Sequence, residues 1–281
     1  HDLARLRQRQ QMAELSSRLG AAAAATPASL MPDVAAAPSS ALATGAIGGE
    51  GSMRGRSALD LPPLTVGPLS LRLAAAKGDP SAEFEGGARL AEGKGTDQSF
   101  KEAVKWYTRS ANQGFAQAQY RLGTLYERGL GVAKDPARAR VWYSRAAEQG
   151  NVKAMHNLAV LNAGGKSGGP DYATASHWFA EAAERGLADS QFNLAVLYDS
   201  GLGVNKDLAM SYHWFAIAAR SGDKEAMRRR DAARAALSPQ QVQSIDERIS
   251  AWQPRASDAI INDARAAGEA WKVRQAAEEN S

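Results

Sequence analysis

The chain contains no cysteine. Disulfide bonds, cysteine nucleophiles and thiolate metal sites are therefore excluded, whereas both a reducing and an oxidising compartment stay compatible with the sequence. Long apolar runs are missing as well, because the stretch nearest to a membrane segment, residues 21–37, is mostly alanine and contains Pro27, Pro32 and Asp33. Such a stretch cannot form the apolar helix of about 20 residues that crosses a bilayer.

A large excess of one charge is also missing. Thirty-four lysines and arginines stand against thirty acidic residues, which gives a formal net charge of +4 and a pI near 9.3. The charges form many Glu/Arg and Asp/Lys pairs, which indicates solvated helix surfaces and no nucleic-acid partner. The densest basic cluster contains no aromatic residue, so we interpret it as a polar cap. Its members are Arg228, Arg229, Arg230 and Arg234.

The first 68 residues contain little that could form a core. Residues 3–19 have the leucine spacing of a short amphipathic helix, but no partner pattern accompanies it. From Gly20 to Pro68 the sequence is dominated by alanine, glycine, proline and serine and has no aromatic residue. Because so little apolar surface can be buried, chain entropy favours the unfolded state. We predict that residues 1–68 are a disordered linker.

The rest of the chain repeats itself with a period of 36 residues. Several residue types recur together over four cycles, which indicates four copies of one structural unit. The clearest series are Trp106, Trp142, Trp178 and Trp214, and Gly114, Gly150, Gly186 and Gly222.

Each cycle contains the signals of two helices. The first, residues 118–128 in the second cycle, has one apolar stripe and stops at Gly129. The second begins at Asp135, an N-cap carboxylate followed by Pro136, and ends at Gly150, where a left-handed backbone closes it. The positions equivalent to Asp135 in the other cycles are Ser99, Asp171 and Asp207.

A single hairpin of two short helices leaves one apolar face exposed to water, so neighbouring hairpins must stack. We predict a solenoid over residues 69–252, in which residues 69–77 cover the first cycle and residues 253–281 are a polar tail. We expect loss of Trp142 or Trp178 to cost roughly 3–5 kcal/mol of stability. The predicted repeats are residues 82–117, 118–153, 154–189 and 190–225, followed by capping helices over residues 226–252.

The cycles fit one pattern, A-x-x-x-L-G-x-L-Y-x-x-G-x-G-V-x-x-D-x-x-x-A-x-x-W-Y-x-x-A-A-x-x-G. It is met almost completely by residues 118–150 and 194–222, and the third cycle departs from it at Asn162 and Ser167. The pattern resembles the Sel1-like repeat, which is similar to the tetratricopeptide (TPR) repeat but has a longer loop between its helices. This resemblance covers residues 82–226. It implies an all-α fold, a right-handed α-α superhelix or solenoid, that serves as an adaptor.

The segments on either side of the repeats carry a second resemblance. GPLSLRLAAAKGDPSAEFE, residues 67–85, and NDARAAGEAW, residues 262–271, resemble the flanks of the repeats in PodJ-type localization factors, the polar organelle development proteins of alphaproteobacteria. The resemblance implies a cell-polarity or envelope localization factor whose repeats lie in the periplasm as part of an inner-membrane protein. A cytoplasmic location is the alternative, and any membrane contact would come from regions outside this chain.

The residues give no sign of catalysis. No apolar strand is present that could carry a nucleophile elbow, so we expect a protein that is not an enzyme. His177 and His213 lie 36 residues apart, but no other ligand type accompanies both, so we expect no metal and no cofactor. His156 takes the place of Tyr120 and Phe192 in the repeat, which predicts that it packs as a flat ring.

A superhelix of this kind offers a continuous groove lined by its first helices. If the leucine stripe points inward, a ladder of six residues is left beside it as the partner-binding surface. We expect it to bind another protein, as an extended peptide or a helical segment. Asn157 and Asn193 could instead hydrogen-bond between neighbouring helices. A further alternative for the whole domain is binding of peptidoglycan. The six residues are Arg121, Thr124, Asn157, Val160, Asn193 and Val196.

Overall fold

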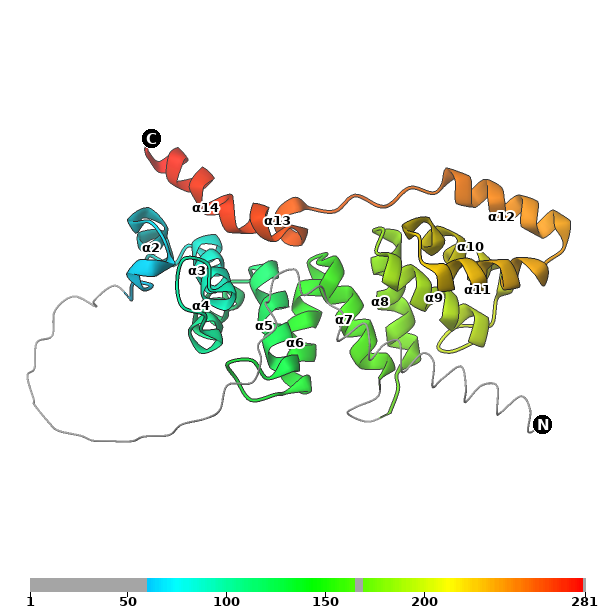
Figure 1. Cartoon of the computed structure of the whole chain (residues 1–281), viewed down its shortest axis with the longest axis horizontal. Helices are drawn as coiled ribbons and strands as arrows, with labels where there is room; N and C mark the ends of the chain where they lie inside the picture. The colour runs from blue at the N-terminus through cyan, green and yellow to red at the C-terminus, as the bar shows by residue number, and fades with distance from the viewer. Residues whose placement is uncertain (1–59, 165–168, 280–281) are drawn as a thin grey trace, which may run out of the picture.

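The computed structural model (Figure 1) describes residues 60–164 and 169–279. All regular secondary structure in these two ranges is helical. The predicted helix at residues 3–19 and most of the predicted linker lie outside the described residues, as does Ser167. The end of that linker is ordered, which corrects its predicted boundary: residues 64–66 form the short helix η2 (Leu64–Val66), and Val66 is buried.

Eight helices form four antiparallel hairpins. We call the first helix of each hairpin the A helix and the second the B helix. The hairpins begin two residues before the predicted repeat boundaries. The A and B helices are, in chain order, α3 (Pro80–Glu92) and α4 (Phe100–Asn112), α5 (Ala116–Arg128) and α6 (Pro136–Glu148), α7 (Val152–Ala163) and α8 (Tyr172–Glu184), and α9 (Ala188–Ser200) and α10 (Leu208–Ala218).

The hairpins follow one another along the long axis of the molecule (Figure 1). Each helix packs against the one before it and the one after it in the chain. Trp106 and Trp214 lie in separate hydrophobic clusters, near opposite ends of the stack. The repeats are therefore successive layers and do not share one compact core.

The B helices begin where the sequence predicts. The side chains of Ser99, Asp135, Asp171 and Asp207 each accept a hydrogen bond from a backbone N–H in the first turn of the helix that follows. These contacts satisfy donors that the helix itself leaves without a partner. The second A helix ends at Gly129 in a left-handed conformation, again as predicted.

A pair of aromatic rings fills the centre of each repeat. One ring comes from the A helix and the other from the residue after the repeated tryptophan on the B helix, with centroids 5.2 to 6.1 Å apart. His156 supplies the A-helix ring of the third repeat, which confirms that it packs as an aromatic residue. The pairs are Phe84 and Tyr107, Tyr120 and Tyr143, His156 and Phe179, and Phe192 and Phe215.

Capping elements close both ends of the stack. Helix α2 (Leu69–Ala76) covers α3, and Val66 reaches the position where Gly86 leaves space in the first repeat. After η3 (Ala219–Ser221), helices α11 (Lys224–Ala235) and α12 (Pro239–Ala251) follow the last hairpin. Ser238 and Gln241 form the capping box that the sequence predicts at the start of α12.

The predicted polar tail after residue 252 is wrong. Residues 264–279 form a helix, α14 (Ala264–Glu279), preceded by the short α13 (Ala259–Asn262). This helix returns along the stack and packs on α3 at the opposite end (Figure 1). Ala267 and Trp271 are buried there, which offsets the entropic cost of ordering the segment.

Candidate binding groove

Only part of the predicted ladder is open to a partner. Arg121 and Asn157 are half-exposed, whereas the other four side chains are buried, so their assignment to the groove surface is corrected. Thr124 donates a hydrogen bond to the carbonyl oxygen of Tyr120, and Val160 and Val196 pack in the core shared by the third and fourth repeats. The hydroxyl of Thr124 also accepts a hydrogen bond from Tyr143 on α6 at 3.2 Å, so this side of α5 faces its own B helix. The four buried members are Thr124, Val160, Asn193 and Val196.

The same ladder extends into the first repeat, where another helix covers it. Glu85 lies 36 residues before Arg121, at the equivalent position of α3. A methyl group added to Gly268 of α14 would collide with the carboxylate of Glu85, so the two helices are in close contact there. Helix α14 thus lies on the ladder side of the A helices, which we call the A-helix face.

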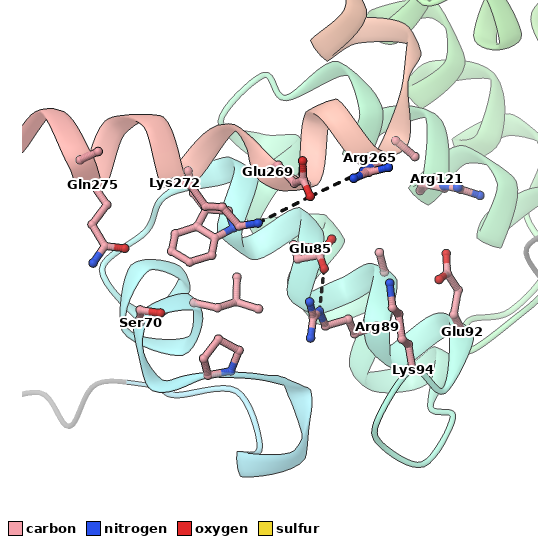
Figure 2. A pocket seen from close by; sticks show the side chains of 17 residues that line it. Ser70, Glu85, Arg89, Glu92, Lys94, Arg121, Arg265, Glu269, Lys272 and Gln275 are labelled. Carbon is pink, nitrogen blue, oxygen red and sulfur yellow. Dashed lines mark hydrogen bonds and ion pairs between the residues drawn. The ribbon is translucent and has the colours of Figure 1, made fainter.

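An open pocket of about 870 Å³ lies between α2, α3 and α14. Figure 2 shows Glu85 and Arg89 on α3 and Glu269 on α14 along its walls. Its charges are largely paired: Glu85 with Arg89 at 2.6 Å, and Glu269 with Lys272 at 3.5 Å. Burial raises the pKa of Glu92, and Arg121 opposes that shift. Mixed charge of this kind suits recognition of a polar helix surface.

A buried hydroxyl joins α14 to the first A helix. Ser81 donates a hydrogen bond to the carbonyl oxygen of Ala267 at 2.7 Å and accepts one from the backbone N–H of Trp271 at 2.9 Å. Two guanidinium nitrogens of Arg274, Nε and Nη2, donate hydrogen bonds to the carboxylate of Asp79, at 2.7 and 2.8 Å. The ion pair, together with the N-cap bonds of Asp79, lowers the pKa of that carboxyl against the effect of burial.

The segment between α12 and α14 binds the turns that join successive repeats. The backbone N–H of Arg255 donates to the carbonyl oxygen of Glu184 at 2.7 Å. The side-chain amide of Asn262 accepts from the N–H of Val152 at 2.8 Å and donates to the carbonyl oxygen of Gly150 at 3.2 Å. Residues 252–279, which we call the strap, therefore contact the third and second repeats before reaching the first.

The sequence interpretation missed the strap, although a signal was present. Ala264, Ala267, Gly268 and Trp271 recur at i, i+3, i+4 and i+7, the spacing of one helix face. The two flanking segments, residues 67–85 and 262–271, were singled out separately, and the structure brings them into contact through Ser81.

The histidines that precede Trp178 and Trp214, and the arginines of the basic cluster, make packing contacts and ion pairs within the chain. His177 stacks edge-on against Trp178, and His213 against Trp214, with centroids 4.9 and 5.0 Å apart. Among the described residues no group of three or more His, Asp or Glu side chains could hold a metal ion. Within the same residues no helix is long and apolar enough to cross a bilayer. In the basic cluster, Arg228 pairs with Glu225 and Arg230 with Asp231.

Four consecutive stretches of the chain match the family model of the Sel1 repeat, namely residues 80–115, 116–151, 152–187 and 188–223. Together they cover just over half of the 281 residues, and their boundaries coincide with the starts of the A helices. The chain belongs to the Sel1 repeat family. Its fold is therefore the right-handed α-α superhelix that the resemblance implies.

A solved Sel1 repeat structure agrees with this assignment. A Sel1 repeat protein from Oxalobacter formigenes is 34% identical, with a TM-score of 0.52, over 56% of this chain and 46% of that protein. The protein c5321, a protective antigen present in uropathogenic Escherichia coli strains, is 26% identical over 72% of this chain and 50% of its own, with a TM-score of 0.42. This chain spans about half the length of both. No curated protein matches it. Sel1 repeat proteins generally mediate protein–protein interaction, on a scaffold that is typically not catalytic.

Proposed function

We propose that this Sel1 repeat protein is an adaptor that binds another protein through its A-helix face, and that it serves as a localization factor of the bacterial envelope or cell pole. One observation carries the binding side of the proposal: the A-helix face already holds a helix, α14, at its first repeat. On the following repeats the same face presents half-exposed Arg121 and Asn157 beside exposed Lys153, all with unused hydrogen-bonding capacity for a partner backbone.

The role in polarity and a periplasmic location are supported by the flanking segments. Residues 67–85 and 262–271 resemble the flanks of localization factors of the PodJ type, and they pack together through Ser81 and Trp271. Two segments that are distant in sequence and joined by a buried hydroxyl form one unit with the first repeat. A resemblance shared by both of them therefore concerns a single piece of structure.

The proposal is tested by cross-linking in cells followed by mass spectrometry, with the native chain compared with Arg121→Glu. We expect the charge reversal to reduce recovery of the main cross-linked protein by about tenfold or more, because a hydrogen bond to a charged group at an interface contributes about 1.5–3 kcal/mol. Arg138→Glu is the matched control, since it makes the same change on the B helix α6, where the arginine side chain is 67% exposed.

Equal recovery with both variants would rule out the A-helix face of repeats two to four as the binding side. Sedimentation with purified peptidoglycan tests the glycan alternative. The guanidinium of Arg145 covers the ring of half-exposed Trp142 at 4.7 Å from its centroid, which leaves less of that ring for stacking on a sugar. Strong co-sedimentation of the native chain would replace the protein partner with the cell-wall polymer.

A further inference from the structure

Helix α14 buries one face against the first repeat and exposes the opposite face to water. Ala267 and Gly268 are buried against α3, and the ring of Trp271 is 6% exposed in the cluster that contains Leu71 and Ala75. Val273, on the opposite side, is 74% exposed. Small residues at i+3 and i+4 let the two helix backbones approach, and the tryptophan supplies the large apolar contact.

The polar contacts of α14 select a helix backbone. The hydroxyl of Ser81 bonds to the carbonyl of Ala267 and to the N–H of Trp271, the two groups that an α-helix pairs across one turn. The hydroxyl can reach both backbone groups only if the docked helix has a small side chain beside them. Asp79 then fixes the orientation of the helix, because its carboxylate binds Arg274 one turn farther on.

The attachment of α14 differs from that of the repeat helices. Each repeat helix packs between two others, whereas α14 packs mainly on α3 and on the short α13 before it. The side chains of residues 253–260 are exposed, so the linker itself adds little buried surface. Helix α14 is thus held by one apolar anchor, one buried hydroxyl and one ion pair at the end of a tether.

We propose that α14 is a tethered internal ligand of the A-helix face, and that the site beneath it is a docking site for a helix of a partner protein. The partner helix would carry small residues at two positions three and four residues after its first contact, an aromatic residue at i+7 and an arginine at i+10. This recognition mode is that of an amphipathic helix in a groove. The inference rests on the proposed function only in taking the A-helix face as the binding side.

A reversible disulfide can hold α14 in place. A Cβ atom on Gly268 would lie 3.7 Å from the Cβ atom of Glu85, within the range that disulfides adopt. The Glu85→Cys substitution also removes the carboxylate with which that Cβ atom would collide. Because the chain has no cysteine, Glu85→Cys combined with Gly268→Cys creates a single defined crosslink. Oxidised and reduced samples of the same protein then differ only in whether α14 can leave.

The probe is a fluorescein-labelled peptide with the sequence of residues 258–279, titrated against the full chain and followed by anisotropy. A tether holds its ligand at an effective concentration on the order of millimolar, so the native site resists the peptide. We expect the full chain with Trp271→Ala and Arg274→Ala to bind the peptide at least about tenfold more tightly than the native chain. Val273→Ala is the matched control and should behave as the native chain, because Val273 faces solvent.

The disulfide variant gives a second, independent readout. We expect no peptide binding when it is oxidised and, after reduction, the weak binding of the native chain, because α14 can then leave but still competes with the peptide. If the Trp271→Ala and Arg274→Ala chain keeps its helical circular dichroism but binds no better than the native chain, α14 is a fixed part of the fold and the proposal fails. Equal binding by the oxidised and reduced forms overturns it as well, even if the substituted chain does not fold.

Dimerisation of the native chain that the oxidised disulfide prevents would identify a second copy as the occupant and overturn the claim of a separate partner. Failure of the proposed function looks different. Suppose that peptide binding follows the predictions but Arg121→Glu recovers the partner normally. The docking site under α14 would then stand, and only the proposal that a partner binds the A-helix face of repeats two to four would be refuted.

Discussion

Gly123 lies directly beneath the ring of Tyr143, and a Cβ atom at Gly123 would come within 2.7 Å of the ring carbons Cδ1 and Cε1. Gly87 has the same relationship to Tyr107, at 2.9 Å. In the last two repeats the equivalent pairs are an alanine and a phenylalanine, Ala159 with Phe179 and Ala195 with Phe215. The hydroxyl of Tyr143 donates to Glu127 at 2.7 Å, which fixes its ring over the glycine.

We therefore expect Gly123→Ala to lower the free energy of unfolding by about 1–2 kcal/mol, because crowding of the ring outweighs the gain in helix propensity. Combination with Tyr143→Phe, which frees the ring from Glu127, should recover at least about 0.5 kcal/mol relative to the sum of the single effects. A double-mutant cycle by urea denaturation measures this coupling. Simple additivity would show that the tyrosine hydroxyl does not hold the ring.

The four repeated tryptophans are not equivalent in their contribution to stability. Trp106 is 1% exposed and Trp214 3% exposed, whereas Trp142 and Trp178 are half-exposed. We expect Trp106→Ala to cost about 3–5 kcal/mol and Trp178→Ala about half as much, which corrects the equal weight that the sequence pattern gives them. Urea denaturation of the two variants tests the ranking. Equal losses would contradict it.

Two buried histidines make stability depend on pH. Burial lowers the pKa of His156 to about 4, and burial, with Arg248 and Arg220 nearby, lowers that of His213 to about 4. An unfolded histidine has a pKa of about 6.5. Below that pH the unfolded chain binds protons that the folded chain does not bind until about pH 4. The free energy of unfolding therefore decreases as the pH falls from about 6.5 to about 4.

His156→Phe should remove about 3 kcal/mol of that decrease, because the phenylalanine stays neutral and the equivalent Phe192 already fills this position in the fourth repeat. Urea denaturation at several pH values between 7 and 4 gives the measurement. His177→Ala, at an exposed position of α8, is the control for loss of an imidazole ring. A native-like profile in His156→Phe would assign the pH dependence to other groups.

Two glycines with the same left-handed backbone should respond differently to alanine. At Gly203 (φ +70°) a Cβ atom would collide with the backbone of Tyr172 in the preceding repeat, whereas at Gly222 (φ +86°) it would meet nothing within 4 Å. We expect Gly222→Ala to cost about 1–2 kcal/mol from backbone strain alone. Gly203→Ala should cost at least about 2 kcal/mol more, since the loop must move off the neighbouring helix. Similar melting temperatures would show that the loop adjusts freely.

The helix pairs could be predicted because their signals are local. A cap at Asp135, a stop at Gly129 and an apolar stripe between two such signals lie within about one repeat of each other, so one sequence reveals them. The role of His156 followed in the same way from its position in the period. The burial of Thr124 and Val196 could not be predicted in this way. Helix periodicity identifies which residues share a face, but it does not show how that face is rotated relative to the neighbouring helix.

The sequence by itself determined the repeat, its period of 36 residues and the family, since each hairpin must bury its apolar side against an equivalent one. Only the tertiary structure decided where the chain's last helix lies. Ser81 and Ala267 are 186 residues apart, and no periodic signal connects them. Their contact depends on the length of the whole stack, which brings the returning strap to the first repeat. The candidate site is therefore a product of the assembled solenoid.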